Sequence, residues 1–577
     1  MNISKATKKN WERLNVNNTD EKLQKRANKF NSKKIVVPKE YQGDKKNAKR
    51  IISFVEEVKD KYEIKDLIYS FALSFLLHYD LIELTDNKIY TNNEILLQIL
   101  NDFNGIQQNE IIRFDLREYD FDILGFIYQI LIIEGEKSKN GVYYTPEKIT
   151  SLMLQDINLQ ENEKLLDPAC GTGSFLLNVQ TSYPENLYGF DIDSNAVFIS
   201  KINLISKHRN KRFSPNIRTL NFLELEDDEL NKLPTFDYII TNPPWGNKVD
   251  IKNEELKKKI LSREFFSYFL IQSSKIFNGK GQCIFLLPES FLKVNAHSQI
   301  RLFLLENFSI DEIHELGKQF TSVLSNVIII KFSRSNNNEV RIYNNHSNFK
   351  ISKNVALNNE GYRLNLFNES DKKVIDKLDS KKMFDLSESK WGLGIVTGNN
   401  KLHIKNRKMS GMEKIYTGKE ISKFKLKESN KYIFYKRDLF QQVAKDSIYR
   451  ADEKLVYKFI SKKLQFAFDD QQRLFLNSAN ILIPKIPLMN VKTVLGFLNS
   501  DVFQFYYLKK FGQIKILKSQ LKKLPFPVIT EKENKEITEL VNEIIHDEKD
   551  DRKLNEYINN IFDLSTEEAE LIRRCVK

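Results

Sequence analysis

The spacing of hydrophobic residues changes near residue 135, where a helical pattern gives way to short strands. Between about 46 and 135 the apolar positions recur at helical spacing, as in Ile51, Val55 and Tyr62. From about 140 to 335, apolar runs alternate with amphipathic stretches. The runs are predicted as strands at 164–166, 187–190, 238–241, 282–287 and 327–332. This alternation predicts a doubly wound α/β domain with a mostly parallel sheet.

The segments on either side have other patterns. Residues 1–45 are polar and rich in Lys and Asn, which predicts an arm without regular structure. The polar stretch 333–338 predicts a turn, and helical spacing returns near the end, where Ser565-Thr566-Glu567-Glu568 forms a capping-box pattern. We expect these segments: an arm and helical region at 1–135, the α/β domain at 136–340, a connection at 341–385, a mixed α+β domain at 386–530 and C-terminal helices at 531–577.

Composition restricts the class of protein. Hydrophobic residues make up 41% of the 577 residues, which is enough for folded cores. No uninterrupted apolar run reaches the roughly 18 residues of a membrane span, and the basic N-terminus lacks the apolar stretch of a secretory signal. Three cysteines exclude a disulfide framework, and the scattered Cys and His residues offer no structural zinc site. A cytoplasmic protein without a bound metal is expected.

The positive charge is concentrated in one segment. The whole chain has a net charge of +13, whereas residues 401–530 contain 27 Lys or Arg and ten Asp or Glu, a balance of +17. Aromatic residues such as Tyr432, Phe434 and Tyr435 stand among these basic residues. A solvated Lys-rich surface would give the same count, but the interleaved aromatics are typical of nucleic-acid binding. We therefore expect a nucleic-acid-binding module attached to a near-neutral enzyme.

A Gly-containing turn follows the first predicted strand. Residues 165–177 are Leu-Leu-Asp-Pro-Ala-Cys-Gly-Thr-Gly-Ser-Phe-Leu-Leu, and the glycines let the backbone approach a ligand. Dinucleotide-binding enzymes share Gly-x-Gly, but their fingerprint has a third Gly where this chain has Leu176. An acid at the strand end would repel a pyrophosphate, whereas it suits the sulfonium and ammonium groups of S-adenosylmethionine. The residues predicted to bind this cofactor here are Asp167, Ala169, Cys170, Gly171 and Gly173.

The next strand also ends in an acidic residue. Asp191 can accept hydrogen bonds from both ribose hydroxyls of the cofactor, and Ile192 can pack on its adenine ring. Capping of the helix at 194–204 is a competing role, more so for Asp193 than for Asp191. We therefore predict Asp191 as the ribose ligand.

The segment Asn242-Pro243-Pro244-Trp245 follows the third predicted strand. The prolines fix the backbone and leave carbonyl acceptors at a strand end, where α/β enzymes place their sites. If the Asn242 side-chain oxygen and the Pro244 carbonyl each accept one N–H of a planar amine, the nitrogen lone pair can point at the methyl group. Trp245 offers a flat face for a base extruded from the duplex. We predict that these four residues form the catalytic loop and that Asn242 also borders the cofactor.

Two other interpretations apply to this loop. A rigid turn with a packed Trp would have the same sequence. Methylation of cytosine at C5 would need a Cys nucleophile, and no Pro-Cys dipeptide occurs. The loop chemistry itself serves N6 of adenine and N4 of cytosine equally.

The motifs and their order resemble the gamma class of DNA amino-methyltransferases, in which a cofactor motif precedes the Gly loop, the catalytic loop follows and target recognition comes last. The segment Gly-Val-Tyr-Tyr-Thr-Pro at 141–146 is similar to the first motif, so the resemblance adds Tyr144, Thr145 and Pro146 to the cofactor site. It extends to Gly-Lys-Gly at 279–281 and Leu-Pro-Glu-Ser at 287–290. The resemblance implies a Rossmann-like methyltransferase domain, and the motif order implies adenine as the target.

The resemblance also implies roles for two further segments. The family usually has Asp-Phe-Leu where this chain has Asn221-Phe222-Leu223. Asn221 can still accept a hydrogen bond from the adenine amino group of the cofactor, with Phe222 beside it. In the family a Phe within the segment equivalent to 316–320 packs against the flipped base, which assigns Phe320 to substrate binding, with core packing as the alternative.

The C-terminal part resembles the recognition domain of the TaqI-like methyltransferases. The similar segments are 391–401, 416–421, 477–480 and 515–518, the last of them leading to Leu-Pro-Phe-Pro at 524–527. The resemblance implies that 386–530 is a target-recognition domain for double-stranded DNA. The lysines of these segments that we expect to contact DNA are Lys401, Lys419, Lys515 and Lys518. The resemblance to these methyltransferases covers about 120–577 in all and assigns no role to residues 1–100.

We predict a site-specific DNA methyltransferase that acts on N6 of adenine as part of a restriction-modification or phage-defence system. N4-cytosine methylation and a modification subunit of a multi-subunit restriction complex remain open, although such subunits normally borrow a separate specificity subunit. Methyltransferases of RNA or of protein glutamine share the catalytic loop but lack the upstream motif and the recognition domain. Glu57-Val58-Lys59 lies on a helix face and does not indicate a fused nuclease, so we expect any restriction endonuclease to be a separate protein.

Overall fold

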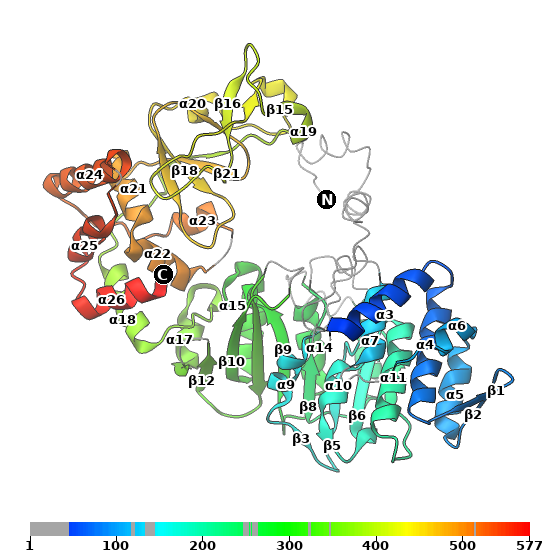
Figure 1. Cartoon of the computed structure of the whole chain (residues 1–577). Coiled ribbons are helices and arrows are strands. Elements are labelled where there is room, and N and C mark those ends of the chain that lie inside the picture. The colour runs from blue at the N-terminus through cyan, green and yellow to red at the C-terminus, as the bar shows by residue number, and fades with distance from the viewer. Residues whose placement is uncertain are drawn as a thin grey trace. The chain divides into compact units, whose positions relative to one another are not determined.

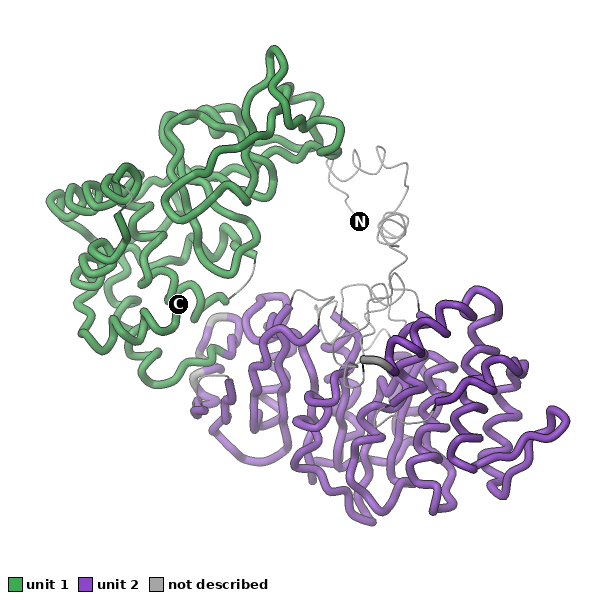
Figure 2. The backbone as a smooth tube through the Cα atoms, in the orientation of Figure 1, with its two compact units in different colours: residues 1–22, 365–577 green, residues 23–364 purple. Residues whose placement is uncertain are grey.

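The computed structural model describes the chain except for residues 1–44, 117–121, 133–144, 246–252, 254–255, 257–263, 321–324, 345–347, 513–514, 548 and 577. The predicted N-terminal arm therefore falls almost wholly outside the described residues. The chain divides into two compact units, residues 23–364 and residues 365–577 together with 1–22 (Figure 2). The clusters of buried apolar residues at 48–205 and 149–329 lie in the first unit, and those at 374–576 and 395–483 lie in the second.

A nine-stranded sheet forms the centre of the unit 23–364 (Figure 1). Its strands, from edge to edge, are β13 (Asn348–Ser352), β12 (Glu339–Tyr343), β10 (Ser309–Gly317), β11 (Val327–Ser333), β9 (Cys283–Pro288), β8 (Tyr238–Thr241), β4 (Leu165–Asp167), β6 (Leu187–Asp191) and β7 (Asn216–Thr219). The strands from β9 to β7 are parallel, and β11 is antiparallel to both of its neighbours. The predicted strands are confirmed as β4, β6, β8, β9 and β11, and so is the doubly wound α/β domain.

The direction of winding reverses at β4. The chain passes from β4 through α10 (Ser174–Asn178) to β6, and through α11 (Ser194–Lys207) to β7. It then returns to the other side of β4 as β8 and continues through α14 (Phe265–Ile276) to β9. The loops after β4, β6 and β8 therefore leave the sheet at the carboxyl ends of parallel strands. They lie at a topological switch point, where open α/β sheets bind their ligands.

The N-terminal helices share a core with one helix of the α/β domain. They are α3 (Lys45–Val58), α4 (Ile64–His78), α5 (Glu94–Phe103), α6 (Asn109–Ile112) and α7 (Ile123–Leu131), interrupted by the hairpin of β1 (Glu83–Thr85) and β2 (Lys88–Tyr90). Their apolar faces pack against Phe198, Ile199 and Ile202 of α11. The rings of Phe103 and Phe198 stack with centroids 3.8 Å apart. The helical region is thus continuous with the domain that follows it.

The strands that the hydrophobic pattern did not predict are polar or carry paired charges. In β10, Ser-Ile-Asp-Glu-Ile-His-Glu-Leu-Gly, the buried Glu312 lies 3.2 Å from the Nζ of Lys331 on β11, and Arg341 of β12 binds its other oxygen at 2.8 Å. These contacts satisfy charges that would be costly to bury alone. β12 and β13 continue the sheet to Ser352, through part of the stretch where a connection was expected.

The other elements of this unit are short. They are α9 (Glu147–Leu154), the β3–β5 pair (Asn158–Leu159 and Gln180–Thr181), η2 (Pro184–Asn186), α12 (Asp227–Leu230), α15 (Ser290–Lys293), η3 (Asn295–His297), α16 (Ser298–Asn307), α17 (Lys353–Asn358) and η4 (Glu360–Tyr362). α10 packs between α9 and α11. A helix that could span a membrane is not found among the residues described.

The unit 365–577 is a mixed α+β structure, as predicted. One sheet has the order β14 (Lys390–Leu393), β21 (Ala479–Ile483), β18 (Lys454–Lys458), β19 (Phe466–Asp469), and a second has β15 (Ile404–Lys405), β17 (Tyr432–Ile433), β16 (Glu413–Tyr416), β20 (Leu474–Phe475). The helices are α18 (Glu369–Ser380), α19 (Asn400–His403), α20 (Asp446–Tyr449), α21 (Val491–Asn499), α22 (Asp501–Lys510), α23 (Lys518–Leu521), α24 (Glu531–His546), α25 (Arg552–Ile561) and α26 (Thr566–Val576).

The capping box predicted before the last helix is present in the structure. The backbone N–H of Glu568 donates to the Ser565 hydroxyl at 3.2 Å, and the Ser565 N–H donates to the Glu568 carboxylate at 2.8 Å. These reciprocal bonds satisfy two amide donors at the start of α26 that have no partner within the helix.

The buried side chain of Arg301 fixes the loops after β9. Its guanidinium donates to the carbonyl oxygens of Phe291 at 2.6 Å and Val294 at 2.9 Å, which lie in and after α15. It also donates to those of Gly361 at 2.6 Å and Tyr362 at 3.0 Å in η4. The planar fork of Arg supplies enough donors in one plane to join these two segments to α16.

Replacing Arg301 with Lys should destabilise the unit 23–364. Lys keeps the charge but not the fork, so some of these buried carbonyls lose their donor. We expect the urea midpoint to fall by the equivalent of about 2–3 kcal/mol. Arg218→Lys, at an exposed position on β7, should change stability by less than about 0.5 kcal/mol. Circular dichroism follows unfolding in urea. Equal midpoints for the two variants would contradict this role of Arg301.

Candidate active site

A buried carboxylate precedes the loop after β4, residues 168–173, which we call the Gly loop. Asp167 is the last residue of β4, and its Oδ1 accepts a hydrogen bond from the Ala169 N–H at 3.1 Å. Its Oδ2 is buried, and the Thr241 side chain is a neighbouring polar group of this carboxyl. Burial raises the pKa of Asp167 to about 7. A carboxylate held in this way is poised to gain stability from a cationic group placed beside it.

The two glycines of this loop have different roles. Both adopt left-handed backbone angles, with φ of 52° at Gly171 and 90° at Gly173. A Cβ added to Gly171 would meet nothing within 4 Å, whereas one added to Gly173 would lie 2.5 Å from the Ser200 hydroxyl on α11. Gly171 therefore leaves open space of the kind that a ligand needs, while Gly173 is required for packing of the loop on α11.

Cys170 is a packing residue of the same loop. Its N–H donates to the Phe190 carbonyl at 2.9 Å, which attaches the loop to β6. The Sγ lies under Gly189, where an added Cβ would approach it to 2.9 Å. Burial raises the pKa of the Cys170 thiol well above its ordinary value, so the thiol stays protonated and is a poor nucleophile.

The acidic residues after β6 separate into two roles. The Asp191 carboxylate accepts hydrogen bonds from the Gly171 N–H at 2.8 Å and from the Asp193 N–H at 3.0 Å, so it connects the loop after β6 to the Gly loop. Burial raises its pKa. Asp193 caps α11, because its Oδ1 accepts from the Asn195 N–H at 3.0 Å. The competing capping role considered for both residues is thus the one that Asp193 has in the structure.

The remaining predicted cofactor residues differ in exposure. Ile192 is 68% exposed, which is unusual for a large apolar side chain at a strand end. Asn221 is also exposed, and its side-chain oxygen accepts from the Leu223 N–H at 3.3 Å. Phe222, in contrast, is buried, with its ring centroid 6.2 Å from Phe190 and 5.9 Å from Phe269.

The catalytic-loop residues Asn242–Trp245 follow β8, directly beside β4. The Asn242 Nδ2 donates to the Thr145 hydroxyl at 3.1 Å, although 97 residues separate the two along the chain. Pro146 follows as the N-cap of α9. Because the amide nitrogen faces Thr145, the carbonyl end of the amide faces the other way. Tyr144 lies outside the described residues.

Trp245, at the end of the catalytic loop, forms an aromatic pair with Phe320. The Trp245 Nε1 donates to the Leu286 carbonyl on β9 at 3.4 Å. Its ring meets that of Phe320 edge to face, with centroids 5.3 Å apart and an interplanar angle of 84°. Pro243 is buried, whereas Pro244 and Trp245 are partly exposed. The structure thus brings together Trp245 and Phe320, which sequence reasoning had assigned to the flipped base separately.

Sequence reasoning missed the contribution of α7 to this region. Asp122 accepts hydrogen bonds from the Thr172 hydroxyl in the Gly loop at 2.8 Å and from the Asn203 Nδ2 on α11 at 2.8 Å. It also caps α7, since it accepts from the Gly125 N–H at 2.7 Å. An Asp before an apolar run with helical spacing indicates a cap, but nothing in the sequence indicates its distant partners.

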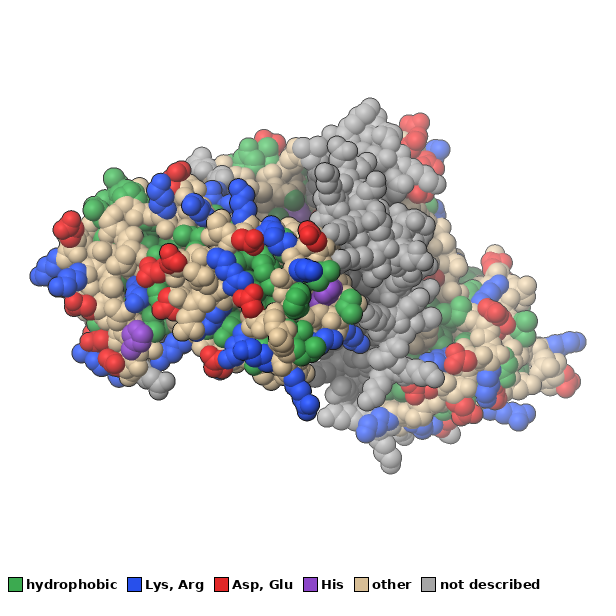
Figure 3. Space-filling view, turned by 90° about the horizontal axis from the view of Figure 1, so that it is seen from above, with side chains coloured by type: hydrophobic (Ala, Val, Ile, Leu, Met, Phe, Trp, Pro, Cys, Tyr) green, Lys and Arg blue, Asp and Glu red, His purple; other side chains and the backbone are tan. Residues whose placement is uncertain are grey.

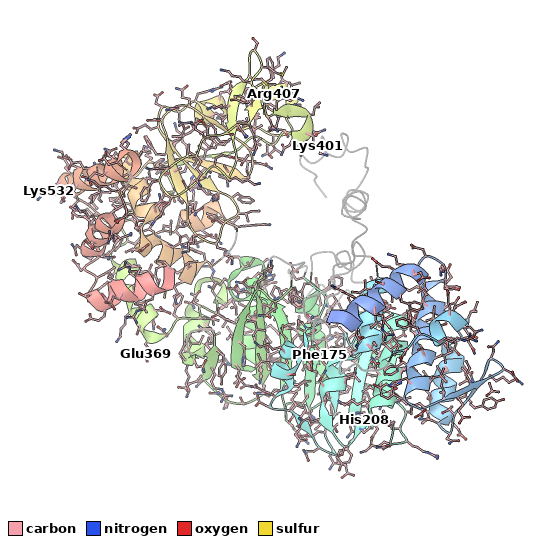
Figure 4. All side chains as sticks on the ribbon, in the orientation of Figure 1. Phe175, His208, Glu369, Lys401, Arg407 and Lys532 are labelled. Atoms are coloured by element: carbon pink, nitrogen blue, oxygen red, sulfur yellow. The ribbon has the colours of Figure 1, made fainter. Side chains whose placement is uncertain are left out.

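The lysines predicted to contact DNA lie in the unit 365–577. Lys401, in α19, and Lys419, Lys515 and Lys518 are all exposed; Figure 4 labels Lys401. The Lys518 ammonium lies 5.6 Å from the centroid of the Trp391 ring.

Other basic side chains of this unit have acidic partners. Arg437, Arg450 and Arg473 form ion pairs with Asp446, Glu413 and Asp469. Figure 3 accordingly shows Asp and Glu side chains among the Lys and Arg on the face it presents. Within the described residues there is no cluster of His, Cys, Asp and Glu that could hold a metal ion.

Known proteins match the chain in both units. Residues 119–384 match the family N-6 DNA Methylase, and residues 413–526 match the TaqI-like C-terminal specificity domain. The type II methyltransferase M.VspI of Vibrio sp. (strain 343) is 30% identical over 337 residues, which cover 56% of this chain and 81% of that protein. The type II methyltransferase M.HincII of Haemophilus influenzae is 27% identical over 271 residues, 44% of this chain and half of that protein.

A solved structure shares the fold over most of the chain. It is that of the type IIL restriction-modification enzyme MmeI in complex with DNA, which has a TM-score of 0.60 and 12% identity, and covers 92% of this chain and 99% of that chain. At this identity the likeness concerns the fold alone. The match to M.VspI, which extends over four fifths of that methyltransferase, is what establishes the relationship. With its Gly loop and its Asn-Pro-Pro-Trp loop on adjacent strands, the chain belongs to the N-6 DNA methylase family and carries a TaqI-like C-terminal specificity domain.

Proposed function

We propose that the chain transfers a methyl group from S-adenosylmethionine to N6 of an adenine extruded from double-stranded DNA. One observation carries this proposal: the acidic Gly loop and the Asn242–Trp245 loop follow the carboxyl ends of two neighbouring parallel strands. A donor site and an acceptor site are then adjacent, as direct transfer between two bound molecules requires. Membership of the N-6 DNA methylase family supports DNA adenine as the acceptor.

The residues around the Gly loop fit S-adenosylmethionine. This cofactor supplies an electrophilic methyl group on a sulfonium. The buried carboxylate of Asp167 would attract the cationic part, and the open space at Gly171 admits a ligand close to the backbone. Asp191 would accept hydrogen bonds from the ribose hydroxyls, and the exposed Ile192 would cover one face of the adenine. Asn221, Thr145 and Pro146 border the same region as proposed ligands.

Asn242 would orient the amino group that accepts the methyl. The hydrogen bond from the Asn242 amide nitrogen to Thr145 fixes the orientation of this side chain, with its oxygen on the side opposite Thr145. If this oxygen and the Pro244 carbonyl each accept one N6–H, the nitrogen becomes more tetrahedral and its lone pair can attack the methyl carbon. The C–S bond breaks as the N–C bond forms, and one N6 proton then leaves to solvent. The residues act by orientation and hydrogen bonding, without a covalent intermediate.

Trp245 and Phe320 would form the wall of the base pocket. An adenine inside a duplex cannot present its amino group to the loop, so the base must leave the stack. The partly exposed Trp245 ring, held edge to face against Phe320 and by its bond to Leu286, offers a fixed stacking surface.

Replacing Asn242 with Ala should lower the rate of methyl transfer by at least about a hundredfold, because one of the two amine-orienting acceptors is removed. Transfer of a tritiated methyl group to DNA measures the rate. Affinities for S-adenosylmethionine and for DNA should stay within about threefold of the wild type. Asn278→Ala is the matched control, because Asn278 binds Asp237 at the opposite end of β8. A rate for Asn242→Ala equal to that of the control would refute the assignment.

The affinity for S-adenosylmethionine should rise with pH through the titration of Asp167. The pKa of this carboxyl is raised to about 7 by burial, and a cationic ligand favours the ionised form. Between pH 5.5 and 7 we expect the dissociation constant to fall by about tenfold. In the free protein the sign is opposite: the raised pKa stabilises the fold at low pH, and this contribution disappears as pH rises toward 7.

Isothermal titration calorimetry at several pH values measures this dependence. Asp167→Asn is isosteric but neutral, so its affinity should be lower at pH 7 and nearly constant across the window. A slope that persists in Asp167→Asn would assign the titration to another group, such as Asp191, and would contradict the proposed role.

The unit 365–577 would select the DNA site. The family match for residues 413–526 is a specificity domain, and the segment 401–530 has a balance of +17. Lys401, Lys419 and Lys515 are exposed, and in the described part of the chain they form no ion pair that would neutralise them. Phosphate contacts by such groups would hold the duplex while other side chains of the unit read the bases.

Replacing Lys401, Lys419 or Lys515 with Ala should lower the slope of log affinity for DNA against log salt by about one for each phosphate that the lysine neutralises. Fluorescence anisotropy with a labelled duplex at several salt concentrations gives the slope. Lys532→Ala is the control, because Lys532 lies on α24 and pairs with Glu536 at 3.8 Å (Figure 4). A lysine whose variant retains the slope of the control does not contact phosphate.

The geometry of Asn242 would serve N4 of cytosine as well as N6 of adenine, so cytosine is the second candidate substrate. Mass spectrometry of nucleosides from DNA methylated by the protein distinguishes the two. The matched specificity domain argues against a subunit that borrows its specificity from another chain. We place the reaction in the cytoplasm of a cell that carries a restriction-modification system, with any nuclease supplied by a separate protein.

A further inference from the structure

Helix α7 contacts both loops that we assign to the cofactor. At its N-terminus Asp122 binds Thr172 in the Gly loop. Further along, the Tyr128 hydroxyl donates a hydrogen bond to Asp193 in the loop after β6. α7 belongs to the N-terminal helical region, where the sequence motifs predict no residue of the site, although it lies within residues 119–384, which match the N-6 DNA Methylase family. These contacts indicate that the region extends into the cofactor site.

The carboxylate of Asp122 is partly buried and accepts three hydrogen bonds. One carboxylate oxygen accepts from the Gly125 N–H at 2.7 Å and from Asn203 at 2.8 Å, and the other accepts from the Thr172 hydroxyl at 2.8 Å. Asn203 donates a second bond to the Thr172 carbonyl at 3.1 Å. The hydroxyl and the carbonyl of Thr172 are therefore both held from outside the Gly loop.

Gly125 makes this arrangement possible. A Cβ at this position would lie 2.0 Å from an oxygen of Asp122 and 2.6 Å from the Thr172 hydroxyl. The absence of a side chain lets the first turn of α7 approach the Gly loop closely enough for direct bonding. Three segments of the backbone therefore lie close together at this point. They are α7, the Gly loop and α11.

We propose that Asp122 is a positioning residue of the cofactor site, which holds the Gly loop through Thr172 in the conformation that accepts the ligand. This inference rests on the proposed function, because it takes the Gly loop to bind S-adenosylmethionine. Tyr128 supports the neighbouring loop in the same way through Asp193. The N-terminal helical region is then a part of the cofactor site.

The physical basis is preorganisation. Gly171 and Gly173 flank Thr172, and each has a wide range of backbone angles when it is not constrained. A loop that is already ordered before the ligand binds loses less conformational entropy on binding, so affinity rises. Thr172 is the residue between the glycines that has hydroxyl and carbonyl groups for anchoring, and both are used.

The test compares two helix caps in the full-length protein. Asp122→Ala removes a cap and the bonds to Thr172 and Asn203, whereas Asn93→Ala removes only the cap of α5, where Asn93 accepts from the Leu96 N–H at 3.1 Å. We expect Asp122→Ala to raise the dissociation constant for S-adenosylmethionine by about tenfold in calorimetry, and Asn93→Ala to change it by less than about twofold. Tenfold corresponds to about 1.4 kcal/mol.

Two further variants separate positioning from general stability. Asp122→Asn can still bond to Thr172, with the hydroxyl as acceptor, and should restore the affinity to within about threefold of the wild type. Thr172→Val should weaken binding as much as Asp122→Ala, and the double variant should be no weaker than either one, because both changes remove the same hydrogen bond. In steady-state kinetics the KM for the cofactor should rise while kcat at saturation changes little.

Each outcome has a distinct meaning. If Asp122→Ala and Asn93→Ala lower the melting temperature equally and bind the cofactor equally well, Asp122 is only a cap and the inference is wrong. It is also wrong if the effects of Asp122→Ala and Thr172→Val add. A wild-type protein that binds no S-adenosylmethionine would instead refute the proposed function itself.

Discussion

The parallel pairing of β4 with β8 is the constraint on which the candidate site depends. The register places Leu165 beside Tyr238 and Leu166 beside Ile239, so the two strands end within one residue of each other and their loops begin side by side. Strand residues rise by about 3.3 Å each, and a slip of two residues would separate the loops by about 6.6 Å along the strands. A methyl group cannot be passed over such a gap. The buried side chains of both strands hold the register, because a one-residue slip would turn each of them to the opposite face, away from its packing partners.

The parts of the fold with strong hydrophobic periodicity could be predicted from the sequence. Val327–Ser333 and Cys283–Pro288 are nearly continuous apolar runs, and buried strands of this kind are visible without a structure. β10 could not be predicted in the same way, since its Glu312 and His314 look like surface residues until the charges on β11 and β12 are placed beside them. Pairing across a sheet is a property of neighbouring strands, and a single strand does not contain it.

The same distinction holds for the site. Residues of a short motif at a strand end, such as Asp167 and Asn242, could be proposed for the site because the motif itself limits what they can do. Phe222 shows the limit of that reasoning, because its buried ring lies between other phenylalanines of the core. Asp122 shows a second limit. Its partners Thr172 and Asn203 are 50 and 81 residues away, and only the folded chain brings them together.

The shared core between α11 and the N-terminal helices has a consequence for how this enzyme could be shortened or recombined. Phe198, Ile199 and Ile202 face the helices, and a chain begun after residue 140 would present these side chains to water. Such an apolar surface promotes aggregation. The boundary that a motif search would draw, just before the first cofactor motif, therefore cuts through a folding unit. Exchange of modules between related enzymes would have to take the helices and α11 together, so that a catalytic cassette of this kind is larger than its motifs suggest.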